Sequence, residues 1–182
     1  MTLSLICHPD FPAEAISAVE VEISFDESRA LVLNYSVFGE ISELEVVEQT
    51  EAKRTDYLWQ KTCFEAFIGA AGEEPYLEFN LSPSTEWAVY AFEDHRRGMR
   101  NPDLMADPKI SLSESSAKYT LVAELDLREL PGMESNCLQL AATAVIEEKN
   151  GRKSLWALAH PSGNPDFHNR DCFVHQLEGA AP

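Results

Sequence analysis

Basic residues are scarce in this sequence: 14 Lys and Arg stand against 31 Asp and Glu, for a formal net charge of −17. Nucleic-acid backbones and anionic membrane surfaces are bound through Lys and Arg, so we expect neither as a partner. No apolar run approaches the roughly 20 residues of a membrane span. The first ten residues lack the basic segment of a secretory signal. We therefore expect a cytoplasmic protein.

Cysteine is also rare, and its four positions form no CxxC pair. The four are Cys7, Cys63, Cys137 and Cys172. This spacing argues against a zinc ribbon or a thioredoxin-type motif. Together with the expected location it predicts reduced thiols and no disulfide. The length of 182 residues, 45% of them hydrophobic, suits a single domain over 1–182, with the oligomeric state left open.

Helical periodicity is almost absent, whereas apolar and polar residues alternate along most of the chain. The expected strands cover 19–25, 31–37, 63–68, 76–82, 86–93, 110–112, 119–125, 138–146, 156–159 and 173–177, with 41–47 as a further candidate. Short strands separated by turns predict an all-β fold, an antiparallel two-sheet β-sandwich of the immunoglobulin-like or jelly-roll type.

The clearest alternation lies in 63–68 and 76–82. Its apolar sides predict four core residues, Phe64, Leu77, Phe79 and Leu81. Pairing Ala66 with Leu77 joins the two apolar faces and stands Glu65 beside Glu78, with Asn80 nearby. Like charges directly opposite cost stability, so this face is either a ligand site or a solvated outer surface.

Two polar segments are further candidates for a site. The connection 94–109 contains Arg96 and Arg97, which either serve the site or pair with surface acids. The loop after 156–159 gathers His160, Asp166 and His168. These three could bind a metal, act as a general acid and base, hold the loop by local hydrogen bonds, or bind a ligand. We expect a ligand and neither a metal nor catalysis.

The chain resembles a bacterial DOMON-like domain, related to family 9 carbohydrate-binding modules. The resemblance is carried by 58–67, by 76–90 with its Asn-Leu-Ser-Pro core, by 96–99, and by 156–173 with its His-Pro and Pro-Asp-Phe-His. It implies an antiparallel β-sandwich that binds sugar or haem. If the ligand is a sugar, the resemblance implies that Glu65 helps to hold it. It also implies that tryptophans clamp the sugar, for which Trp59, Trp87 and Trp156 are the candidates. For haem, it implies axial ligands at Met99 and His160.

We therefore predict a non-enzymatic domain that binds a carbohydrate or a small polar glycan in one pocket at a rim of the sandwich. The expected ligand-binding residues are Trp59, Glu65, Glu78, Asn80, Trp87, Arg97, Trp156, His160, Asp166 and His168. The alternatives are a b-type haem domain and a protein-interaction module without a small ligand.

Overall fold

The computed structural model describes residues 2–178 and contains eleven strands and three short 3-10 helices. In chain order they are β1 (Thr2–Cys7), β2 (Ile16–Phe25), β3 (Ala30–Gly39), η1 (Ile41–Glu43), η2 (Leu58–Gln60), β4 (Cys63–Ala70), β5 (Tyr76–Leu81), β6 (Trp87–Phe92), β7 (Lys109–Glu114), β8 (Lys118–Asp126), β9 (Cys137–Glu147), β10 (Lys153–Ala157), η3 (Arg170–Cys172) and β11 (His175–Glu178). The predicted all-β class is confirmed.

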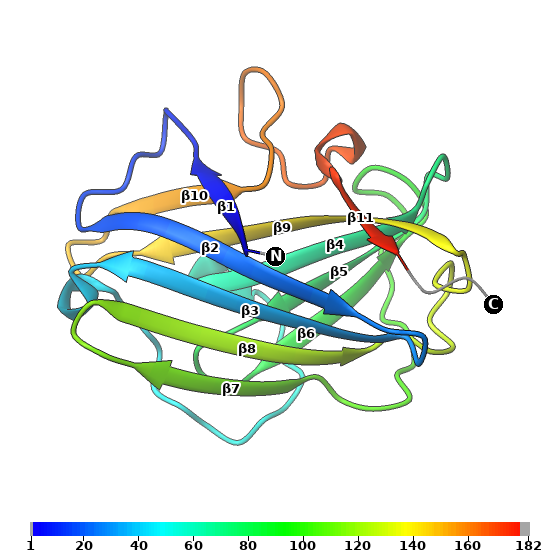
Figure 1. Ribbon diagram of the computed structural model, residues 1–182, viewed down its shortest axis with the longest axis horizontal. Coiled ribbons are helices and arrows are strands. Elements are labelled where there is room, and N and C mark those ends of the chain that lie inside the picture. Colours follow the sequence, from blue (N-terminus) through cyan, green and yellow to red (C-terminus); the bar gives the residue numbers. More distant parts are fainter. Residues whose placement is uncertain (1, 179–182) are drawn as a thin grey trace.

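The strands form one antiparallel sheet in the order β6-β5-β4-β9-β10-β1-β2-β3-β8-β7, with β11 added to β9. The sheet curls, so that β2, β3, β8 and β7 cross over β9, β4, β5 and β6 (Figure 1). Strand β1 joins the two halves, because Thr2–Leu5 pair with β2 and Ile6–Cys7 pair with β10. The halves predicted as separate sheets are thus parts of one curled sheet.

The main core lies between the two halves of the curled sheet. It contains all four predicted core residues, which are 0–1% exposed: Phe64, Leu77, Phe79 and Leu81. From the other half, Leu33 and Tyr35 of β3 join the same cluster. The Tyr35 hydroxyl donates a 2.7 Å hydrogen bond to the backbone oxygen of Glu65, which ties β3 to β4 across the core. The prediction of which face is apolar is therefore confirmed.

Two local predictions were wrong. Residues 41–47 form η1 and a loop, because the buried Ile41 and Leu44 recur at a spacing of three, which suits a 3-10 turn rather than a strand. The β4–β5 register is displaced by two residues: Ala66 pairs with Phe79, and Glu65 with Asn80. Because the register is displaced by an even number of residues, every side chain stays on its predicted face.

The position of Gly69 explains why the β4–β5 register is displaced. This residue continues β4 instead of starting the turn, so the turn begins only after Ala70. A Cβ at Gly69 would lie 2.4 Å from Nη1 of Arg170 and 2.9 Å from the backbone oxygen of Pro75. The glycine therefore serves a close approach between segments rather than a turn.

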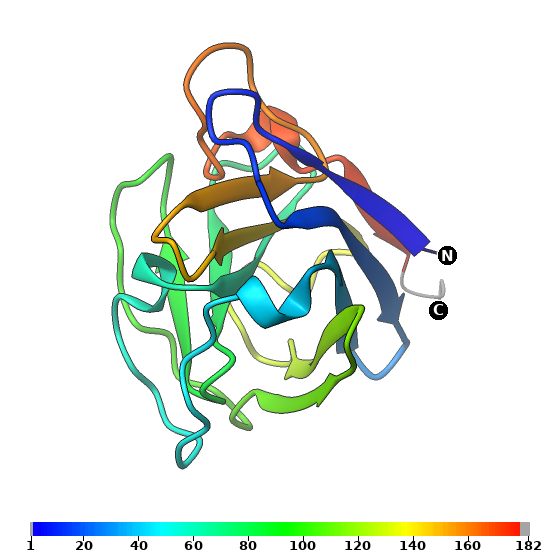
Figure 2. The ribbon, with the colours of Figure 1, turned by 90° about the vertical axis from the view of Figure 1, so that its left-hand side faces the viewer.

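The outer face of β4, β5 and β6 is buried as well, since every residue of these three strands is buried. A second apolar cluster lies there, made of Phe67, Tyr76, Ala88, Tyr90, Phe92, Ala141 and Phe173. The segment between β10 and β11 (orange to red) rises beside the segment between β1 and β2 (dark blue) at one side of the molecule (Figure 2). Nε2 of His8 lies 3.1 Å from the Gly163 oxygen and links these two segments.

Candidate functional site

A cavity of about 810 Å³ lies on the outer face of the sheet. Its floor is formed by side chains of β4, β5, β6, β9 and β10, and its walls by loop residues. The aromatic and sulfur-containing side chains around it are Phe11, Tyr57, Trp59, Phe67, Tyr90, Phe92, Met99 and Phe167. Four of these, Phe11, Tyr57, Trp59 and Met99, are exposed. The cavity therefore combines a buried floor with an open apolar rim.

Two glutamates form the polar part of the floor. Glu65 is 3% exposed and Glu78 is 6% exposed. The Thr143 hydroxyl donates to Oε2 of Glu65 at 3.1 Å, and the Asn80 amide donates to Oε1 of Glu78 at 2.7 Å. Since both carboxyl groups are buried, the alternative of a solvated outer face is wrong. The observed register places the two glutamates diagonally, which reduces their repulsion.

The two glutamates share an environment that favours a proton. Burial and, after it, the nearby Glu78 raise the pKa of Glu65 to about 8, against the lowering effects of Thr143 and Arg96. Burial also raises the pKa of Glu78, against the hydrogen bond from Asn80 and the charge of Arg96. Near neutral pH the pair therefore retains a proton and presents both a donor and acceptors to the cavity.

His168 is fixed at the edge of this pair by a chain of hydrogen bonds. The backbone N–H of Arg96 donates to the Tyr76 hydroxyl at 3.1 Å, and that hydroxyl lies 2.7 Å from Nδ1 of His168. While it accepts from Arg96, the hydroxyl can still donate its own proton to Nδ1, and the imidazole proton then lies on Nε2. Nε2 lies 3.7 Å from Oε2 of Glu78, too far for a hydrogen bond.

His168 is neutral at physiological pH. Burial lowers its pKa to about 4, and the positive charge of Arg96 acts in the same direction. The close approach of His168 to Glu78 is therefore not an ion pair near neutrality. The neutral ring instead serves as a polar wall of the cavity, held in place by Tyr76.

Asp166 anchors the loop that carries Arg96. Its carboxylate accepts from Nη2 of Arg96 at 2.9 Å and lies 2.7 Å from Nε2 of His95. Burial alone would raise the pKa of Asp166, but these two contacts lower it. Arg96 therefore occupies the place predicted for Arg97. The side chain of Arg97 instead points outward and is 79% exposed. Its Nη1 lies 3.4 Å from Oδ2 of Asp94.

The difference between the two arginines arises in one tight turn. Arg97 and Asp94 form an isolated bridge, and the intervening Arg96 has a φ of 54°, in the left-handed region. Consecutive side chains in this turn therefore point to different sides. Sequence alone identified the cationic pair but could not say which member faces the site.

The structure brings several predicted site residues together. Trp59, Glu65, Glu78 and His168 line the cavity, as does Met99 of the haem alternative. Asn80 lies behind Glu78 and Asp166 behind Arg96, through the hydrogen bonds given above. Glu65 and His168 thus share one cavity, as the single-pocket hypothesis required.

Two of the three predicted tryptophans lie elsewhere. Trp87 and Trp156 belong to the main core, each 5% exposed, because each falls on the apolar face of its strand. The Trp156 indole donates to the Ser154 hydroxyl at 2.8 Å. Trp59 alone among the three tryptophans reaches the cavity. A clamp of two tryptophans is therefore not formed.

His160 lies outside the cavity lining. Its Nε2 is 2.8 Å from the backbone oxygen of Ile6. The centroid of its ring lies 4.9 Å from that of the His8 ring and 6.2 Å from that of the Phe167 ring. Met99 is 62% exposed at the rim. Within residues 2–178 no group of three or more His, Cys, Asp or Glu side chains has the arrangement of a metal site. His160 thus orders the loop that supports Phe167.

Tyr90 is a cavity residue that the sequence left undecided, since either Tyr90 or Trp87 could have joined the face of Glu78. The β5–β6 register pairs Glu78 with Tyr90. The Tyr90 hydroxyl donates to Asp56 at 2.7 Å, and the Arg54 guanidinium lies 5.1 Å from the ring centroid. The unbroken apolar run of β6 was the available signal, because such runs indicate strands that are covered on both faces.

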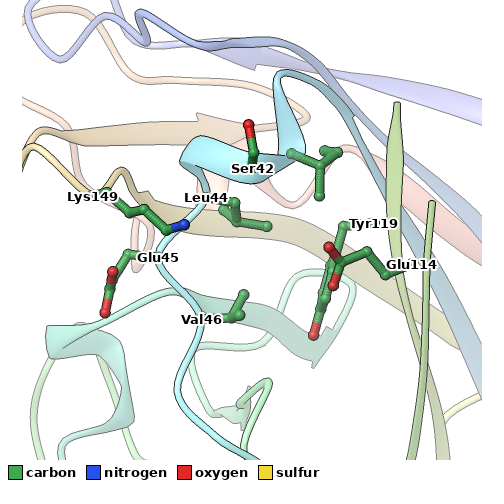
Figure 3. A pocket seen from close by; sticks show the side chains of 8 residues that line it. Ser42, Leu44, Glu45, Val46, Glu114, Tyr119 and Lys149 are labelled. Atoms are coloured by element: carbon green, nitrogen blue, oxygen red, sulfur yellow. The ribbon is translucent and has the colours of Figure 1, made fainter. Parts of the chain in front are cut away.

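A second, smaller hollow of about 160 Å³ lies where the segment after η1 meets the β7–β8 hairpin (Figure 3). It is lined by Ile41, Ser42, Leu44, Glu45, Val46, Glu114, Tyr119 and Lys149. The larger cavity is the better candidate, because it alone of these two has buried carboxyl groups on its floor.

Comparisons with known proteins bear on the fold. No protein-family model and no curated protein sequence matches this chain. Among solved structures, it is similar to a candidate carbohydrate-binding protein from Bacteroides uniformis, with a TM-score of 0.69 and 12% identity over 94% of this chain and 83% of that one. A family 9 carbohydrate-binding module from Caldicellulosiruptor kristjanssonii, solved with glucose, has a TM-score of 0.55 and 10% identity over 94% and 80%.

A family 9 carbohydrate-binding module from the same organism, solved with cellotriose, has a TM-score of 0.55 and 11% identity over 89% of this chain and 75% of that one. At these identities the likeness establishes a shared fold.

None of the helices within residues 2–178 is long and apolar enough to cross a membrane. None of the four cysteines, all within residues 2–178, is paired in a disulfide.

Proposed function

We propose that this protein is a non-catalytic domain that binds a carbohydrate in the cavity above Glu65 and Glu78. One observation carries the proposal: the cavity places aromatic rings around a buried floor of hydrogen-bonding groups. Aromatic faces pack against the C–H groups of a sugar, while carboxyl groups and imidazole bond its hydroxyls. The exposed ring of Trp59 at the rim would stack on the sugar.

The structural neighbours support this proposal. Two of them are family 9 carbohydrate-binding modules in complex with glucose and with cellotriose. We extend the proposal to a relationship with bacterial DOMON-like domains, to a sandwich-type architecture and to a cytoplasmic location. The charge of −17 supports the expectation that neither nucleic acid nor a membrane is the partner.

Titration calorimetry with glucose and cellotriose tests the proposal. We expect saturable binding, weakened about tenfold in Trp59→Ala through loss of the stacking ring. Met105→Ala is the matched control, because Met105 is 56% exposed and lies outside the cavity lining. An equal loss in both variants would contradict a sugar site here, as would absence of binding by these two sugars and by an amino sugar such as glucosamine.

The haem alternative receives no support from the placement of its two residues, since Met99 lines the cavity and His160 does not. We propose that the protein has no resident cofactor. A Soret band in the purified protein, or one that forms when haem is added, would overturn that proposal. A protein-interaction module without a small ligand would bind neither sugar nor haem.

A further inference from the structure

We propose that the cavity prefers sugars that carry a free amine, with the ammonium group held between the side chains of Glu65 and Glu78. This inference rests on the proposed function and specifies its ligand class. It starts from the two carboxyl groups, which are buried, lie on adjacent strands and line the same cavity.

Each carboxyl group has one oxygen that is left for a ligand. Thr143 bonds Oε2 of Glu65 and Asn80 bonds Oε1 of Glu78. Among residues 2–178 no hydrogen bond reaches Oε1 of Glu65, and the approach of His168 to Oε2 of Glu78 is 3.7 Å. Neither oxygen is among the fully enclosed polar atoms without a partner, so both are open to the cavity and can accept a hydrogen bond from a bound molecule.

The local cations do not meet this need. The Arg96 guanidinium pairs with Asp166 at 2.9 Å, and among residues 2–178 it forms no ion pair with either glutamate. Lys153, also in the cavity lining, donates its ammonium hydrogen to the backbone oxygen of Gln60 at 2.5 Å. His168 is neutral near pH 7, as shown above. Two adjacent carboxyl groups thus share the floor without a cation placed between them.

An ammonium group matches this arrangement better than a hydroxyl. It has three donors and a positive charge, whereas a hydroxyl has one donor and no charge. Hydrogen bonds between ionised partners are about twice as strong as those between neutral groups. The net charge of −17 also raises the local concentration of cations near the protein.

Binding of the ammonium group would displace the proton that the glutamate pair retains, and that proton would pass to the buffer. The surrounding titratable and charged groups are Cys63, Tyr76, Tyr90, Arg96, Asp166 and His168, and the cavity lining adds Asp56, Tyr57 and Lys153. Burial raises the pKa of Cys63 and of both tyrosines and so keeps them neutral, while Arg96 and Asp166 are already paired. Beneath the floor, Tyr35 is held neutral too, because burial raises its pKa. The glutamate pair is therefore the source of the proton.

Calorimetry with glucosamine, glucose and N-acetylglucosamine at about pH 6.5 tests the inference, because an amine with a pKa near 8 is then protonated. We expect glucosamine to bind at least about tenfold more tightly than either neutral sugar. Repetition in buffers of different ionisation enthalpy should show release of about one proton with glucosamine and less with glucose.

Glu65→Gln should reduce the ratio of glucosamine to glucose affinity toward one, and Glu78→Gln provides a second test if the first variant does not fold. Glu124→Gln makes the same charge change at an exposed site on β8 and should leave the ratio unchanged. Equal binding of all three sugars would overturn the amine preference while leaving the proposed function intact. Binding of none of them would overturn both.

Discussion

The raised pKa of Glu65 predicts an unusual pH dependence of folding. In the folded state this carboxyl group loses its proton near pH 8, whereas the value for an unburied group is 4.5. Between these two values the folded protein binds more protons than the unfolded chain. The free energy of unfolding should therefore fall as the pH rises through this range.

His168 acts in the opposite direction at lower pH. Its pKa is lowered from 6.5 to about 4, so the unfolded chain binds more protons there and stability rises with pH up to about 6.5. Between about pH 4.5 and 6.5 the effects of Glu65 and His168 on stability oppose each other. The contribution of Glu65 is therefore visible between pH 6.5 and 8, where at about 1.4 kcal/mol per pH unit it amounts to a loss of roughly 1.5–2 kcal/mol.

Urea unfolding of the wild type and of Glu65→Gln at pH 6.5, 7.2 and 8.0 measures this loss. The variant lacks the titrating group, so its free energy of unfolding should stay nearly constant over the range. The exposed Glu124→Gln should show the wild-type decrease. Parallel curves for wild type and Glu65→Gln would refute the assignment of the buried proton to this residue.

Three further predictions concern the core, the site loop and the thiols. Phe79→Ala should lower the free energy of unfolding by about 3–5 kcal/mol in urea, since the ring is 1% exposed, whereas Val174→Ala, at a 57% exposed position, should cost under about 0.5 kcal/mol. Arg96→Ala should raise the pKa of Glu65 in a carboxyl NMR titration, because Arg96 lowers it. Arg97→Ala should leave that titration unchanged. Thiol counting under denaturing conditions should find all four cysteines free in protein prepared with its thiols protected.

The faces of β4 and β5 could be predicted from sequence because alternation with period two directly reports which side chains share a face. Glu65, Glu78 and Asn80 were placed on the correct face even though their register was two residues off. Register depends on where the turn begins, and Gly69 looked like a turn residue while its actual role involves the distant Arg170. Such a contact leaves no local signal in the sequence.

The walls of the site could be predicted less well, because loop residues reach the cavity through backbone conformations that side-chain patterns do not report. Arg96 and Arg97 are chemically equivalent, and only the left-handed φ of Arg96 decides which one faces Asp166. Trp87 and Trp156 are aromatic residues on strands, but their strand parity places them in the core. Trp59 lies in η2, outside the strands, and reaches the rim.

The split pairing of β1 has a consequence for the order of folding during synthesis. Strand β1 can pair with β2 as soon as the first 25 residues have emerged, but its other partner, β10, begins only at Lys153. Until then the Ile6–Cys7 end of β1 remains an unpaired strand edge, the kind of surface that can join another chain. Pairings between segments so far apart in sequence form slowly. The pairing of β1 with both halves of the sheet is therefore complete only after β10 has been synthesised.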